Sequence, residues 1–131
     1  MKYTKDNPFL VKMVRNIPVN FTGVVKDEYG DIFHYLNGLY HREDGPACEY
    51  ADGSKHWYFN GKLHRTDGPA KELSYGRKEW WLNDNYHRED GPACEYANGD
   101  KGWYLNGKRY GSNDDYTNES WIRFIRLELL K

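Results

Sequence analysis

The chain contains three tandem copies of a 23-residue segment, which align without a gap over residues 41–63, 64–86 and 87–109. The first and third copies are identical at 18 of 23 positions, and all three copies share 11 residues. Self-similarity at a fixed period is the signature of a repeat architecture, in which each unit buries surface mainly against its neighbours. We therefore expect the array to determine the fold.

Each copy carries the turn residues of a β-hairpin. Asp52-Gly53 and Asn60-Gly61 are pairs favoured in type I′ turns, and Asp44-Gly45-Pro46 marks a further break in the chain. The short runs between these turns are rich in aromatic residues, as is typical of strands. The sequence predicts a mainly β protein, a single-layer antiparallel meander of repeated β-hairpins over residues 22–110.

The array needs an additional copy and caps at its two ends. Residues 22–40 form a degenerate copy, with Asn37-Gly38 one period before Asn60-Gly61. Residues 1–21 are expected to form an N-terminal cap with a short helix that starts at Pro8. Residues 111–131 are expected to form a linker and a C-terminal capping α-helix, because Thr, Asn and Ser precede an apolar helical face.

The order W-Y-x-N-G-K-x-H-R-x-D-G-P-A, which runs here from Trp57 to Ala70, resembles a variant of the MORN repeat family. The resemblance covers residues 22–110, and His-Arg-x-Asp-Gly-Pro-Ala stands in place of the usual glycine-rich link. Arrays of this variant occur in bacterial and bacteriophage proteins. MORN repeats are associated with protein–protein scaffolding and with lipid headgroups, so the resemblance implies a hairpin meander with a binding role.

Aromatic residues recur at the same unit positions and should form rows about 10 Å apart along the sheet. One row is Trp57, Trp80 and Trp103; the next residue of each copy faces the other way and gives the row Tyr58, Trp81 and Tyr104. We expect the tryptophan row to be core. We expect the second row, with Tyr50 and Tyr96 nearby, to be an exposed partner surface, although rings on both faces leave open which face is exposed.

The repeated loop carries residue types that are common in enzyme sites. Its chemically active residues are His41, Arg42, Asp44, His64, Arg65, Asp67, His87, Arg88 and Asp90. Copies about 10 Å apart cannot share one metal ion, and a catalytic centre is usually unique rather than triplicate. We therefore predict a structural loop, with no catalytic, metal or cofactor site. We expect its Asp residues to hold turn amides and its Arg residues to pair with carboxylates of an adjacent unit.

Cysteine and charge content limit the cell compartment and the partners. Cys48 and Cys94 are two periods apart, roughly 20 Å, which is too far for a disulfide. Free thiols fit a reducing compartment, and neither a membrane span nor a secretory signal is apparent, so we predict a cytoplasmic protein (in the host cytoplasm if encoded by a phage). With a net charge of -1, nucleic acid is not an expected partner.

These observations predict a non-enzymatic protein-interaction module. It would be an adaptor or a small phage-type inhibitor that binds a host protein through its aromatic sheet face. The alternative is a binder of a nucleotide or phospholipid headgroup on a basic and aromatic stripe that includes Lys55, Lys78 and Lys101, provided that the acidic residues point elsewhere. Open sheet edges or the C-terminal helix also allow a homodimer. The middle copy differs most from its neighbours, so a specific site is expected there.

Overall fold

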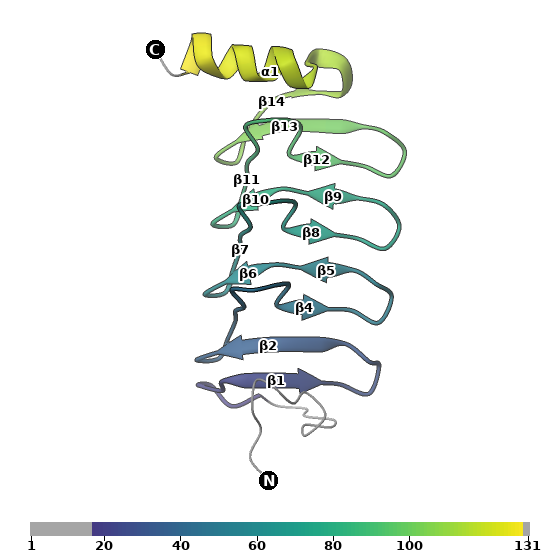
Figure 1. The fold of residues 1–131 in the computed structure, drawn as a ribbon, viewed down its shortest axis with the longest axis vertical. Coiled ribbons are helices and arrows are strands. Elements are labelled where there is room, and N and C mark those ends of the chain that lie inside the picture. The colour runs from purple at the N-terminus through teal and green to yellow at the C-terminus, as the bar shows by residue number, and fades with distance from the viewer. Residues whose placement is uncertain (1–16, 130–131) are drawn as a thin grey trace.

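The computed structural model describes residues 17–129, which form an elongated ladder of short antiparallel strands with a helix across its C-terminal end (Figure 1). The strands are β1 (Gly23–Lys26), β2 (Ile32–Leu36), β3 (Leu39–Tyr40), β4 (Cys48–Glu49), β5 (Lys55–His56), β6 (Tyr58–Phe59), β7 (Lys62–Leu63), β8 (Lys71–Glu72), β9 (Lys78–Glu79), β10 (Trp81–Leu82), β11 (Asn85–Tyr86), β12 (Cys94–Glu95), β13 (Lys101–Leu105) and β14 (Lys108–Ser112). The prediction of a mainly β, single-layer meander of hairpins is confirmed.

The main sheet follows the order β1-β2-β4-β5-β8-β9-β12-β13-β14, so each repeat adds one hairpin to the previous one. Backbone bonds close the seam between units. The amides of Trp57 and Trp80 donate to the carbonyls of Ala70 and Ala93 in the next copy, each at 2.7 Å. These alanines are fully buried, which explains why the repeat has so small a residue at this position.

A second, shorter hairpin in each unit projects from the main sheet. It comprises β2 with β3, β6 with β7, β10 with β11, and the end of β13 with β14. Successive short hairpins are joined by two backbone hydrogen bonds. In the first pair, the amide of Gly61 donates to the carbonyl of Tyr40 at 2.8 Å, and the amide of Arg42 donates to the carbonyl of Tyr58 at 3.1 Å. The array is thus a continuous sheet with a second file of hairpins along one side.

The tips of these short hairpins are type I′ turns. Asn60 and Gly61 have φ values of 49° and 80°, both in the left-handed region that this turn requires. In the middle unit the pair is Asn83-Asp84, with φ values of 47° and 67°. Asp84 tolerates this conformation, and its carboxylate accepts a bond from the amide of Leu63 at 2.7 Å, which links the turn to the preceding unit.

The C-terminal cap is α1 (Asn118–Phe124), which continues as a π-helical turn η3 (Ile125–Leu129) after the 3-10 turn η2 (Asn113–Asp115). Thr117 caps α1 by accepting a bond from the amide of Ser120 at 3.1 Å. Trp121 and Ile125 are buried in one hydrophobic cluster with Trp103 and Leu105. The predicted capping helix is confirmed, whereas the predicted N-terminal helix lies outside the described residues.

Candidate functional site

The repeated loop holds each unit to the one before it through an arginine stacked on a tryptophan. The guanidinium carbon of Arg65 lies 3.9 Å from the ring centroid of Trp57, and that of Arg88 lies 3.8 Å from the ring of Trp80. The loop glycine covers the opposite side of the guanidinium, since a Cβ at Gly68 would lie only 2.8 Å from the Arg65 carbon. The arginine is therefore enclosed between two units.

The polar edge of the same guanidinium is bonded within its own unit. Arg65 donates to Asp67 at 2.8 Å, to the carbonyl of Pro69 at 3.0 Å and to Glu72 at 3.3 Å. The hydrogen bond from Arg65 holds the pKa of Asp67 below its ordinary value. One expectation was wrong here: the carboxylate partners belong to the same unit, because the adjacent unit contributes the ring instead. The aspartate binds the guanidinium in addition to a backbone amide.

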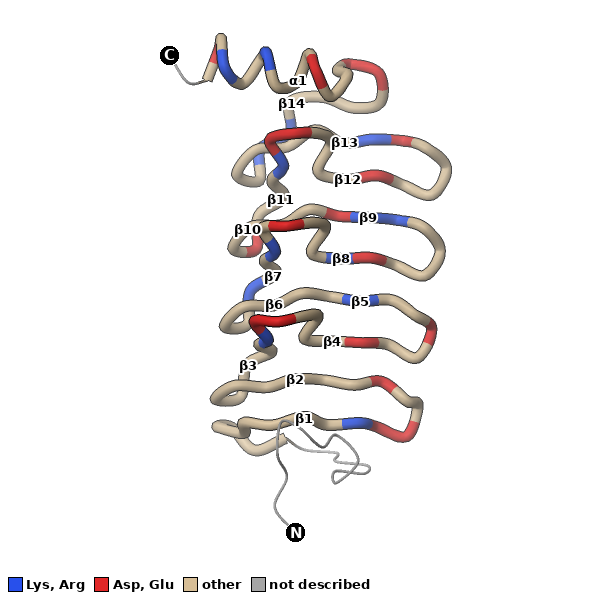
Figure 2. Tube along the Cα trace, in the orientation of Figure 1, with Lys and Arg blue, Asp and Glu red and all other residues tan. Residues whose placement is uncertain are grey.

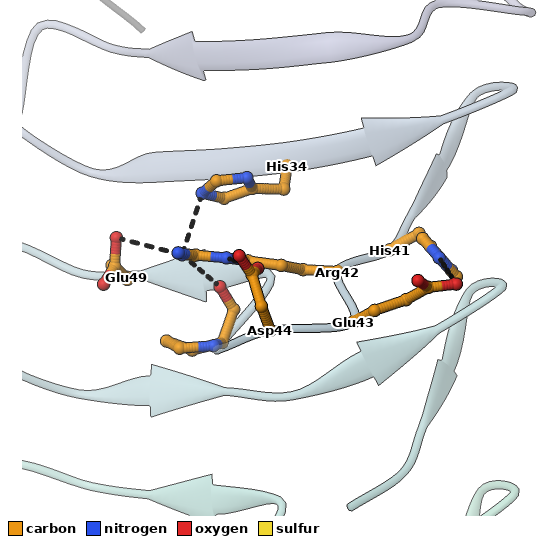
Figure 3. A network of polar contacts seen from close by, with 7 residues as sticks. His34, His41, Arg42, Glu43, Asp44 and Glu49 are labelled. Carbon is orange, nitrogen blue, oxygen red and sulfur yellow. Dashed lines mark hydrogen bonds and ion pairs between the residues drawn. The ribbon is translucent and has the colours of Figure 1, made fainter. Parts of the chain in front are cut away.

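The first copy shows how the loop behaves where no tryptophan is present. His34 occupies the equivalent position, and Figure 3 shows its ring beside the guanidinium of Arg42, with Nε2 3.2 Å from Nη1. Arg42 also donates to Asp44 at 2.8 Å and forms an ion pair with Glu49 at 3.9 Å. Partial burial, together with the nearby Arg42 charge, lowers the pKa of His34.

The loop histidines secure the short-hairpin turn at the other end of their own copy. The Nδ1 atoms of His41, His64 and His87 accept bonds from the amides of Asn60, Asn83 and Asn106 at 2.9, 3.2 and 3.0 Å. A ring nitrogen that accepts carries no proton, so the hydrogen resides on Nε2. Each His, Arg and Asp of the loop thus makes a structural contact that recurs from copy to copy.

The candidate partner surface is a half-buried face of mutually packed rings rather than a freely exposed strip. Tyr58, Trp81 and Tyr104 are all half-buried. Tyr40 lies 5.2 Å from Tyr58, while Tyr86 lies 3.9 Å from Trp81 and 4.9 Å from Tyr104 between ring centroids. Tyr40 and Tyr86 belong to the short hairpins, and their repeat at one position, with Leu63 between them, is the sequence signal that could have revealed them.

The two further candidates lie beside this row. The ring centroids of Tyr50 and His56 lie 4.9 Å apart. Tyr96 is 36% exposed, and the guanidinium carbon of Arg77 lies 4.5 Å from its ring centroid. Burial, aided by the charge of Lys71, lowers the pKa of His56 to about 4. The face therefore combines tyrosine hydroxyls and rings with a neutral histidine at ordinary pH.

The middle unit places a buried carboxylate on this face. Glu79 is 4% exposed, and it accepts from the indole of Trp81 at 2.9 Å and from the hydroxyl of Tyr86 at 3.3 Å. It also pairs with Arg77 at 2.6 Å. Its counterparts in the flanking units are His56 and Gly102, so this group distinguishes the middle unit. Its carboxylate thus links the Trp81 and Tyr86 rings to Arg77.

Lysines and glutamates alternate along the main sheet instead of forming a basic stripe. Lys55 pairs in register with Glu49 and Glu72, and Lys78 pairs with Glu72 and Glu95. Figure 2 shows these opposite charges on neighbouring strands. The condition for the anionic-ligand alternative, that the acidic residues point elsewhere, is not met.

The last candidate groups are the two cysteines. Cys48 and Cys94 are buried free thiols, and burial raises their pKa values to about 12 and about 11. Within residues 17–129, no group of three or more His, Cys, Asp or Glu side chains is placed to hold a metal ion. None of the described helices is both long and apolar enough to cross a membrane.

Comparison with known proteins adds no assignment. No protein-family model matches the chain, and no curated protein is significantly similar to it. The resemblance of its repeat to MORN-like arrays therefore stays a prediction.

Proposed function

We propose that this chain is a non-enzymatic protein-interaction module that binds another protein through the aromatic face of its hairpin array. The observation that carries the proposal is the row Tyr58, Trp81 and Tyr104, half-buried and flanked by Tyr40 and Tyr86. Tyr and Trp are the residue types that dominate binding hot spots.

The arrangement of layers supports this proposal. The described part of the chain has one layer of strands, and its helix packs on the last hairpin against Trp103 and Tyr110 rather than over the middle of the array (Figure 1). Rings braced against one another lose little side-chain freedom when a partner covers them, which favours affinity. The module would act as an adaptor or as a small inhibitor of a host protein.

A non-enzymatic role also agrees with how the loop side chains are used. Each loop histidine accepts a backbone amide, and each loop arginine is bonded within its unit and enclosed by a ring or by His34. Catalytic groups need a reactive atom left available to the substrate. We infer that these residues maintain the scaffold.

Affinity purification from the native host, followed by mass spectrometry, tests the proposal. The bait is compared with the triple variant Tyr58→Leu, Trp81→Leu and Tyr104→Leu; leucine is chosen because Leu63 already occupies this face. Tyr75→Ala, at a turn residue that is 63% exposed, is the matched control. We expect a partner that the wild type and the control retain and the triple variant loses, with unchanged circular dichroism. Equal recovery by the triple variant would refute the proposed surface.

A second copy of the chain is the competing partner. Light scattering distinguishes the two cases: a monomer that captures another protein supports the proposal, whereas a dimer dissociated by the triple leucine variant would show that the face serves self-association.

A further inference from the structure

Three equivalent grooves lie along the repeated loops, one for each successive unit, and none of them is lined by Tyr58, Trp81 or Tyr104. Their volumes are about 500, 730 and 670 Å³ in chain order. The floor of each groove has a ring and an apolar side chain from the same two repeat positions: His34 and Leu36, Trp57 and Phe59, Trp80 and Leu82. Phe59 is 42% exposed, and it lies between the rings of His41 and His64 at 4.6 and 6.2 Å.

The ridges between the grooves are acidic. Glu43 and Asp44 line both the first and second grooves, Thr66 and Asp67 line both the second and third, and Glu89 and Asp90 line the third. These carboxylate side chains are 70–85% exposed, whereas the arginines beside them are only 18–26% exposed. The loop arginines also line the grooves, but each groove has one more carboxylate than guanidinium among its lining residues, so a ligand that follows the grooves meets a net negative charge.

The spacing of the grooves restricts the conformation of such a ligand. Two strands separate equivalent grooves, a step of about 9.4–9.8 Å. A polyproline II helix advances about 9.3 Å in three residues and returns the same side of the chain to the surface at each step. In an extended β-strand, side chains three residues apart point to opposite sides, so only alternate grooves would be filled.

We propose that this row of grooves binds a basic polyproline II segment of a partner protein, one triplet to each unit. In each triplet a proline rests on the apolar side chain of the groove, beside the ring that the loop arginine covers, and a lysine or arginine reaches the neighbouring carboxylates. Aromatic-lined grooves suit prolines because the ligand is already extended before it binds. This site uses none of Tyr58, Trp81 and Tyr104, so the chain would hold two partners, or two segments of one partner.

Fluorescence anisotropy with a labelled peptide of four Lys-Pro-Pro triplets tests the proposal. A peptide of four Glu-Pro-Pro triplets reverses the charge, and one of four Lys-Gly-Gly triplets keeps the charge but loses the polyproline II conformation. We expect binding of the Lys-Pro-Pro peptide that weakens as salt is added, no binding of the Glu-Pro-Pro peptide, and affinity at least tenfold lower for the Lys-Gly-Gly peptide.

Protein variants locate the bound peptide. Phe59→Ala removes an exposed groove side chain and is expected to weaken binding about tenfold, and the pair Glu43→Gln and Glu89→Gln should weaken it severalfold and reduce its salt dependence. Tyr75→Ala and the triple leucine variant of the tyrosine face should bind as the wild type does. Absence of Lys-Pro-Pro binding, equal binding of the Lys-Gly-Gly peptide, or unchanged affinity in Phe59→Ala would each overturn the proposal.

Discussion

Replacement of Arg65 tests the contact that joins one repeat to the next. Its side chain is 20% exposed, its guanidinium stacks on Trp57 at 3.9 Å, and it donates to the carbonyl of Pro69 at 3.0 Å and to Glu72 at 3.3 Å. Arg65→Ala removes all of these contacts at once. It leaves Glu72 without its cationic partner in the loop.

The expected loss can be estimated from those contacts. A half-buried cation–π stack contributes about 1 kcal/mol, and hydrogen bonds from a charged donor contribute about 2 kcal/mol in this setting. The pairing with exposed Asp67 adds little because water screens it. We expect Arg65→Ala to lower the free energy of unfolding by about 3 kcal/mol, a large share of the stability of a small domain.

Urea unfolding followed by tryptophan fluorescence measures this loss. Arg65→Lys keeps the charge but loses the flat, forked donor, so it should still cost about 2 kcal/mol. Lys55→Ala is the matched control: this lysine is exposed and faces Glu49 and Glu72, and its loss should change stability by less than about 0.5 kcal/mol. If Arg65→Lys were as stable as the wild type, a simple charge would suffice and the stacking argument would be refuted.

Further predictions concern the loop glycine, the buried histidine and the cap. Gly68→Ala places a Cβ 2.8 Å from the guanidinium carbon of Arg65. It should lower the free energy of unfolding in urea by about 1–3 kcal/mol in the wild type and by little in an Arg65→Ala background. Equal losses in both backgrounds would contradict the enclosure of the guanidinium. His56, with a folded-state pKa of about 4, binds fewer protons when folded than when unfolded, so stability should fall by about 2–3 kcal/mol as the pH drops from 6.5 to 4. His56→Phe, which introduces the residue that Phe33 provides at the same unit position, should remove that part of the pH dependence, and an unaltered slope would show that other groups cause it. Trp121→Ala should lower the free energy of unfolding by about 3–5 kcal/mol, because the ring is fully buried and its indole donates to the carbonyl of Arg88 at 2.8 Å. Thr117→Ala, which removes only the helix cap, should lower it by about 1 kcal/mol. Thermal unfolding that ranks the two variants in the opposite order would refute this account of the cap.

The hairpin array and the C-terminal cap could be predicted because they depend on local signals. Turn pairs such as Asn60-Gly61, the 23-residue period and the capping residue Thr117 each act within a few residues of the structure that they specify. These local signals were sufficient to predict the hairpin meander, and no information about side-chain packing was needed.

The partners of the loop residues could not be predicted in the same way. Arg65 and Trp57 are both visible in the repeat, but their spacing along the chain does not show that the guanidinium lies on the preceding ring rather than beside a carboxylate of the adjacent unit. Similarly, the sequence shows the tyrosine row only as one strand position in each copy. Its partial burial comes from Tyr40 and Tyr86 on the short hairpins.

Side-chain nuclear Overhauser effects offer the most direct test of the claim that each loop arginine packs against a ring of the unit before it. The account predicts cross-peaks from the Arg65 side chain to the ring of Trp57, repeated one period later between Arg88 and Trp80. Cross-peaks from Arg65 to Trp80 in its own unit, without any to Trp57, would contradict it.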